Sequence, residues 1–167
     1  LNKISINVRV HENLIRPSHM FNYLKQGEHE PLVKMVDYFI KRQKKNRKWK
    51  NVPDGKSKYN YFLDQECEIF SDLVARFESD YIFCWLDWDG DNILMDGSVI
   101  DFGSIRQFGL FHHEYRFDDV SRLSTSIKEQ KHKAKYTVQT FIQMIDFVKT
   151  GKKKPIKNFA NHPVLKK

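Results

Sequence analysis

The sequence has few of the features that mark a secreted or membrane protein. It contains two cysteines, Cys67 and Cys84, which are too few for a disulfide framework and suit a reducing compartment. No apolar run approaches the roughly 20 residues that a helix needs to cross a bilayer, and no secretory signal pattern is recognisable. These absences predict a cytoplasmic location and no association with a membrane.

Clustered glycines are also lacking. The seven glycines lie scattered at positions 27, 55, 90, 97, 103, 109 and 151. They form no glycine-rich loop of the kind that covers the phosphates of ATP in protein kinases. We therefore expect a nucleotide-covering lobe to be missing from this chain. Because the chain begins inside an alternating, strand-like pattern, we also expect it to be a fragment of a longer protein.

The net charge of +8 comes from two basic tracts and not from the whole chain. Residues 41–50 carry seven Lys and Arg, residues 151–167 carry six, and neither tract contains an acidic residue. The rest of the chain has 16 basic and 21 acidic side chains, so its own balance is negative. Either tract could contact nucleic acid, but such tracts are more often solvated helix ends or tails. The distribution argues against a nucleic-acid partner, and we expect the tail at 151–167 to be loosely held.

The hydrophobic pattern predicts one domain over residues 1–167, mainly α-helical with a short β-hairpin (α+β). Residues 4–10 alternate between apolar and polar side chains, and residues 1–10 are expected to enter the domain as a strand. Apolar residues at helical spacing predict helices at about 17–26, 31 to near 51, 59–78, 119–127 and 130–150. Pro17 is expected to open the first of these helices, and Gly27 to end it.

One stretch, residues 84–103, concentrates the residues that are suited to chemistry. Within it, two short apolar runs at 92–95 and 98–101 are joined by Asp96 and Gly97. An Asp-Gly pair between apolar runs is a strong hairpin signal, because a type I′ turn needs a positive φ at both central positions. The stretch therefore predicts a tight β-hairpin.

The ends of this hairpin predict a metal site. Strand pairing would bring Asn92 and Asp101 to the same end, and their side-chain oxygens suit Mg²⁺, a hard ion that also keeps waters and binds phosphate. The order of residues is that of the protein-kinase core, where Asp-x-x-x-x-Asn precedes Asp-Phe-Gly. Asp87 and Asn92 have the first spacing, and Asp101-Phe102-Gly103 is the second motif.

A closer resemblance is to the selenoprotein O family of protein adenylyltransferases. Asp91-Asn92 followed by residues 100–103, Ile-Asp-Phe-Gly, is similar to the Asp-Asn pair that precedes Asp-Tyr/Phe-Gly in that family. Residues 8–16, Val-Arg-Val-His-Glu-Asn-Leu-Ile-Arg, are similar to the family's Arg-Val-x-x-x-x-Ile-Arg segment. Residues 85–89 depart from the family, which has His-Gly-Val-Met-Asn before the Asp-Asn pair.

The resemblance implies the fold of a protein-kinase C-terminal lobe and an ATP- and Mg²⁺-dependent transferase that moves AMP onto Ser, Thr or Tyr hydroxyls of a protein substrate. It implies that Arg9 and Arg16 contact phosphates, and that Asp91 assists the attacking hydroxyl or the metal. Two alternatives stay open. One is a phosphotransferase with Asp87 as the base, and the other is a catalytically silent, kinase-like binding module.

Overall fold

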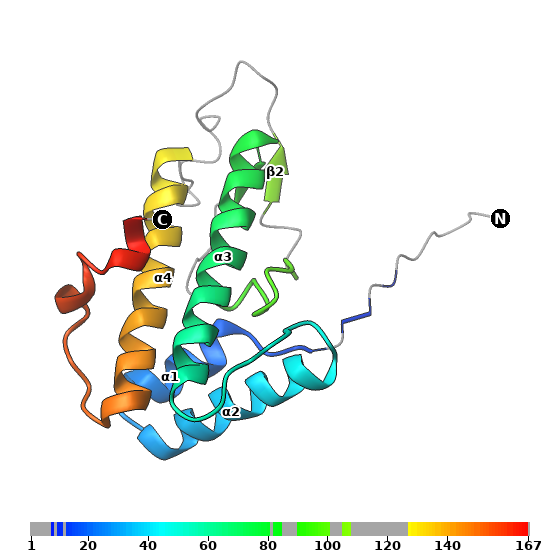
Figure 1. The fold of residues 1–167 in the computed structure, drawn as a ribbon. Coiled ribbons are helices and arrows are strands. Elements are labelled where there is room, and N and C mark those ends of the chain that lie inside the picture. Colours follow the sequence, from blue (N-terminus) through cyan, green and yellow to red (C-terminus); the bar gives the residue numbers. More distant parts are fainter. Residues whose placement is uncertain are drawn as a thin grey trace.

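Four α-helices make up most of the part of the chain that the structure describes. The computed structural model describes residues 8, 10–11, 13–80, 82–84, 90–100, 105–107 and 127–166. The helices are α1 (Pro17–Gln26), α2 (His29–Lys45), α3 (Ser57–Ser79) and α4 (Ile127–Thr150), followed by the short 3₁₀ helices η3 (Ile156–Phe159) and η4 (Pro163–Lys166). Strand β1 (Ile82–Cys84) pairs with β2 (Ile105–Gln107) in an antiparallel ladder (Figure 1). The prediction of a mainly helical domain is confirmed.

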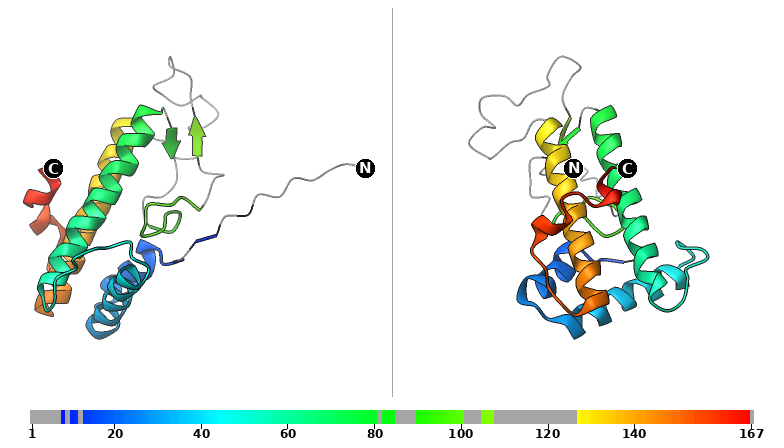
Figure 2. Two further views of the ribbon diagram at one scale, coloured as in Figure 1. Left: turned by 45° about the vertical axis from the view of Figure 1, so that its right-hand side comes forward. Right: turned by 60° about the vertical axis from the view of Figure 1, so that its left-hand side comes forward.

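The two long helices, α3 and α4, lie side by side and form the centre of the domain (Figures 1 and 2). Helices α1 and α2 pack against the C-terminal end of α4, while the β1–β2 pair lies at the opposite end (Figure 2). The 3₁₀ helices contact α4. Although α3 and α4 are long, no helix among the described residues is apolar enough to span a membrane.

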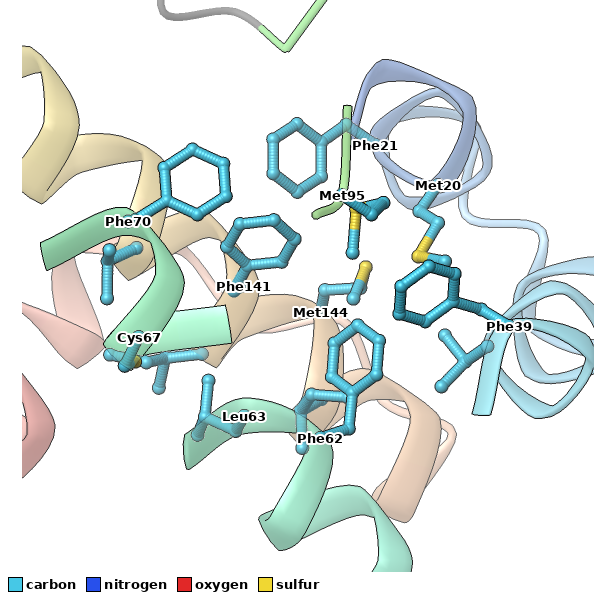
Figure 3. Packing of buried hydrophobic residues seen from close by; sticks show 14 of the residues in the cluster. Met20, Phe21, Phe39, Phe62, Leu63, Cys67, Phe70, Met95, Phe141 and Met144 are labelled. Atoms are coloured by element: carbon cyan, nitrogen blue, oxygen red, sulfur yellow. The ribbon is translucent and has the colours of Figure 1, made fainter. Parts of the chain in front are cut away.

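Aromatic rings form the core where α1, α3 and α4 meet. The ring of Phe141 on α4 has its centroid 5.0 Å from that of Phe21, 5.3 Å from that of Phe70 and 6.3 Å from that of Phe62 (Figure 3). These pairs are tilted or edge-to-face, which is the arrangement that the charge distribution of aromatic rings favours. The predicted apolar stripes of the long helices therefore face one another.

Three helices match their predicted ranges closely. Helix α1 begins at Pro17, because the fixed φ of proline suits a first helical position, and ends before Gly27, which has a φ of 75°. Helix α3 extends the predicted range of 59–78 by two residues at the start and one at the end. Helix α4 begins three residues before the predicted start and ends where predicted. Another helix was predicted at about 119–127. Residues 119–126 lie outside the described part of the chain, and residue 127 is the first residue of α4.

Helix α2 differs from its prediction at both ends. It begins at His29 and not at Pro31, because a proline in the first turn occupies a position whose N–H would have no partner within the helix. It ends at Lys45, well before residue 51, and Arg47 has a φ of 56°. The basic tract therefore leaves the helix in a left-handed turn.

The predicted N-terminal strand is not supported by the residues that the structure describes. Val8 and Val10 belong to no strand, and their side chains are 75% and 86% exposed. Their alternating pattern needs a sheet to cover its apolar side, and these two side chains face solvent instead. The remaining residues of 1–10 lie outside the described part of the chain.

The predicted hairpin of residues 92–95 and 98–101 is not formed as two strands. Ile93 and Val99 make a single antiparallel bridge, and neither apolar run is a strand over its described residues. The side chains of both bridge residues are buried, so packing against the helices holds this segment. The segment is therefore a turn that is held mainly by its buried side chains. The single bridge between Ile93 and Val99 contributes little.

The turn itself is not the predicted type I′. Leu94 donates its N–H to the carbonyl of Ser98 at 2.8 Å, and Gly97 donates its N–H to the carbonyl of Leu94 at 2.9 Å, which closes a three-residue loop. Gly97 has a φ of 78°, whereas Asp96 does not have a positive φ. The reason is local, because the Asp96 carboxylate accepts the N–H of Ser98 at 2.9 Å and favours an ordinary turn conformation.

The lysine-rich tail after α4 is held in place, so the prediction of a loose tail is wrong. Two glutamines of α4 reach its main chain: Gln143 donates Nε2 to the carbonyl of Lys154 at 2.6 Å, and Gln139 donates Nε2 to the carbonyl of Ile156 at 2.8 Å. The side chain of Phe159 is buried. These side-chain amides bind the main chain of the tail, and this fixes the tail along α4.

Candidate functional site

The residues that precede α1 meet the segment 90–100 at the N-terminal end of α1. Ser18 donates its N–H to the carbonyl of Gly90 at 3.2 Å, and Met95 donates its N–H to the carbonyl of Ile15 at 3.0 Å. The side chain of Met95 lies in the core between α1 and α4 (Figure 3). These bonds and this packing fix the segment against the start of α1.

This junction brings together Arg16 and Asp91, two of the predicted site residues. The Arg16 Nη1 atom lies 3.9 Å from the Asp91 Oδ1 atom, and the two side chains are 43% and 58% exposed. An ion pair this exposed contributes little to stability. Asp91 follows Gly90, whose carbonyl accepts an N–H of the first turn of α1, so its carboxylate also lies near the positive end of that helix dipole.

Gly90 makes this approach possible, and the sequence alone did not identify it as a site residue. Its φ is 98°, and a Cβ atom at this position would lie 2.7 Å from the Cβ of Pro17 and 2.8 Å from the N atom of Ser18. No side chain fits between the loop and the helix. Its position between two aspartates indicated a glycine in a loop. The contact with Pro17 and Ser18 could not be predicted, because these residues lie far away in the sequence.

Asn92 is the one predicted metal ligand that the structure describes. Its side chain is half-buried, and its main-chain carbonyl accepts the N–H of Ile100 at 3.0 Å. Ile100 directly precedes Asp101 in the sequence. Asp101, Arg9 and Asp87 lie outside the described residues, so the structure does not place these three predicted site residues.

The donors at this site have the chemistry that Mg²⁺ requires. Asp91 and Asn92, which are neighbours in the sequence, carry carboxylate and amide oxygens, and these are hard donors. Among the described residues, no group of three His, Cys, Asp or Glu side chains converges on one point. Mg²⁺ at a nucleotide site needs only one or two protein oxygens, because phosphates and waters complete its shell. Asn92 would be one of those donors, with Asp101 as its predicted partner.

A buried carboxyl group, Glu66 of α3, lies close enough to the 90–100 turn to be affected by the charge of Asp96. The Glu66 side chain is 0% exposed, and neither of its carboxylate oxygens has a hydrogen-bond partner among the described residues. Burial raises the pKa of Glu66 well above its ordinary value, and the negative charge of Asp96 raises it further. The sequence could have indicated this burial, since Glu66 lies between Phe62 and Ile69 at helical spacing and so falls on the apolar face of the helix.

Comparison of the chain with known protein families, with curated proteins and with solved structures finds no match. The kinase-like fold and the adenylyltransferase activity therefore remain proposals. Their support comes from the order of the sequence motifs and from the contact between Arg16 and Asp91.

Proposed function

We propose that this chain is the helical lobe of a kinase-like enzyme that uses ATP and Mg²⁺ to transfer AMP to hydroxyl groups of a protein. The observation that carries the proposal is the 3.9 Å approach of the Arg16 guanidinium to the Asp91 carboxylate. The resemblance assigns phosphate contact to Arg16 and assistance of the attacking hydroxyl or the metal to Asp91. Both roles belong to one nucleotide site, and the two residues come close although their segments lie far apart in the sequence.

The position of Arg16 beside Asp91 supports a separate role for each side chain. The Arg16 guanidinium would bind phosphate oxygens, for which its planar shape suits paired hydrogen bonds. Asp91 would accept the proton of the attacking hydroxyl while the hydroxyl oxygen bonds to the α-phosphorus. The bond from that phosphorus to the bridging oxygen breaks, and pyrophosphate leaves. Mg²⁺ would supply neutralisation of the phosphate charge, held by Asn92 and Asp101.

Labelled ATP tests the proposal directly with the native protein and a mixture of candidate protein substrates. Label on the α-phosphate should become attached to protein, and label on the γ-phosphate should not. Transfer of the γ-label instead would assign phosphoryl transfer, with Asp87 as the candidate base. No transfer of either label, with ATP binding retained, would assign a catalytically silent binding module.

The two candidate bases should differ sharply when each is replaced. Asp91→Ala is expected to lower the rate of α-label transfer by about 10²–10⁴-fold, because proton acceptance in the transition state is lost. Asp87→Ala is the matched control and should cost at least about tenfold less than Asp91→Ala. Both rates are measured as kcat/KM. Greater damage in Asp87→Ala, together with γ-label transfer, would contradict the assignment of Asp91.

A further inference from the structure

A concave groove of about 620 Å³ lies between α1, α4 and the chain that follows α4. Its floor is apolar, with Phe21 and Leu24 from α1 and Ile156 from the tail. Figure 2 shows the tail leaving the end of α4 beside α1. Because the Lys154 carbonyl accepts a 2.6 Å hydrogen bond from Gln143, the tail forms a fixed third wall.

The two threonine hydroxyls of the α4 wall are already paired, and one aromatic ring is exposed beside them. Thr137 donates its hydroxyl to the carbonyl of Lys133 at 3.2 Å, and Thr140 donates its hydroxyl to the carbonyl of Tyr136 at 3.0 Å. Tyr136 is 55% exposed and offers its ring to a ligand. The α4 wall therefore presents an aromatic face and hydroxyls that are already used.

The rim of the groove is cationic. Lys25, Lys133 and Lys153 supply its charge, and no acidic side chain is among its described lining residues. Lys153 donates its Nζ to the carbonyl of Lys25 at 2.8 Å, at the last turn of α1. The ammonium groups of Lys25 and Lys133 form no ion pair within the part of the chain that the structure describes. The groove thus has unneutralised positive charge around an apolar floor.

We propose that this groove binds an acidic peptide segment with one apolar anchor side chain. The anchor packs between Tyr136 and Ile156, and carboxylates on either side of it pair with Lys25 and Lys133. Charge complementarity identifies the partner, because an apolar floor inside an unpaired cationic rim matches an apolar side chain flanked by acids. Single-stranded nucleic acid is matched less well, since it binds through several stacking rings and Tyr136 is the one large ring exposed here among the described residues.

The groove is separate from the candidate nucleotide site, so this inference does not depend on the proposed activity. Both lie along α1, with Arg16 at one end of the helix and Lys25 in its last turn. The proposed partner binds through its side chains and undergoes no chemistry in the groove. Binding can therefore be measured without ATP.

The test uses a fluorescently labelled peptide of glutamates around a central leucine, with binding to the native protein followed by anisotropy. We expect micromolar affinity, and a loss of about tenfold or more when the glutamates become glutamines, because several exposed charge pairs are then lost together. Replacing the leucine by alanine should weaken binding to a similar degree. No binding of the parent peptide overturns the proposal.

A pair of double variants separates this groove from general attraction to a basic protein. K25E/K133E should lose peptide binding by about tenfold or more, whereas K41E/K44E should bind nearly as the wild type does. Each variant changes two lysines on helices by the same charge, and one of each pair lies in the last turn of its helix. Circular dichroism confirms that both are folded.

A third variant tests the apolar wall. Tyr136→Ala should weaken peptide binding several-fold with little loss of stability, because the ring is largely exposed. If the two double variants lost peptide affinity equally, binding would come from general attraction to a basic protein, and the proposal would be overturned. Tighter binding of a single-stranded oligonucleotide that displaces the peptide would overturn it in favour of nucleic acid.

Discussion

Gly90→Ala is expected to lower the free energy of unfolding by about 2–4 kcal/mol, from backbone strain at a positive φ and from a steric clash. The clash is with the start of α1, where a Cβ atom would lie 2.7 Å from the Cβ of Pro17 and 2.8 Å from the N atom of Ser18. Relief requires the loop to move away, which breaks the hydrogen bond from Ser18 to Gly90 and separates Asp91 from Arg16. Urea denaturation measures the loss of stability, and α-label transfer measures the loss at the site.

Gly55→Ala provides the matched control. Gly55 has a φ of 63°, so an alanine there is also strained, but no atom lies within 4 Å of its added Cβ. It should therefore cost only about 1–2 kcal/mol, the price of left-handed backbone alone. Equal costs in the two variants would show that the contact of Gly90 with α1 contributes nothing.

Glu66→Met is expected to stabilise the protein at neutral pH and to remove a pH dependence of its stability. The ordinary pKa of this carboxyl is 4.5, and below about that pH Glu66 is protonated in both the folded and the unfolded chain. Above that pH the unfolded chain releases the proton while the folded chain keeps it, because burial raises the pKa of Glu66. Stability therefore falls as the pH rises towards the raised pKa, by at most about 1.4 kcal/mol per pH unit, the limit for one proton.

The measurement is the free energy of unfolding of both proteins at several pH values between 4 and 8. The Glu66→Met protein should lack most of the decline and should exceed the wild type at pH 7 by more than about 1 kcal/mol. Glu68→Met, at an exposed position two residues along the same helix, should stay within about 0.5 kcal/mol of the wild type. Parallel pH curves for the wild type and Glu66→Met would show that Glu66 does not keep its proton on folding.

Local chemistry allowed the helices to be predicted well, and side-chain hydrogen bonds to the main chain explain two of the failures. Pro17 and Gly27 act on their own backbone, so the bounds of α1 could be predicted from the sequence. The turn at Asp96 was predicted with the wrong geometry, because its side chain bonds to Ser98. The prediction of a loose tail was wrong because a run of lysines does not show that Gln143 will bind the main chain of the tail.

The candidate site was only partly predictable, for a similar reason. Arg16 and Asp91 could be chosen from a resemblance of short motifs, but nothing in their spacing shows that they meet. Gly90 escaped notice because the atoms that exclude a side chain there belong to α1. Glu66 stood in an apolar stripe, where a carboxyl is a conflict between local pattern and burial, and such conflicts are worth noting from sequence alone.

The junction of α1 with segment 90–100 also constrains the order in which the protein can assemble. Arg16 leaves the ribosome before its partner Asp91, which is made only after α2 and α3 have been synthesised. Closing so long a loop costs chain entropy that local helix formation does not recover, so the contact between Ser18 and Gly90 depends on prior packing of the helices. A nascent chain that ends before residue 90 already contains Arg16 and α1 but has no site.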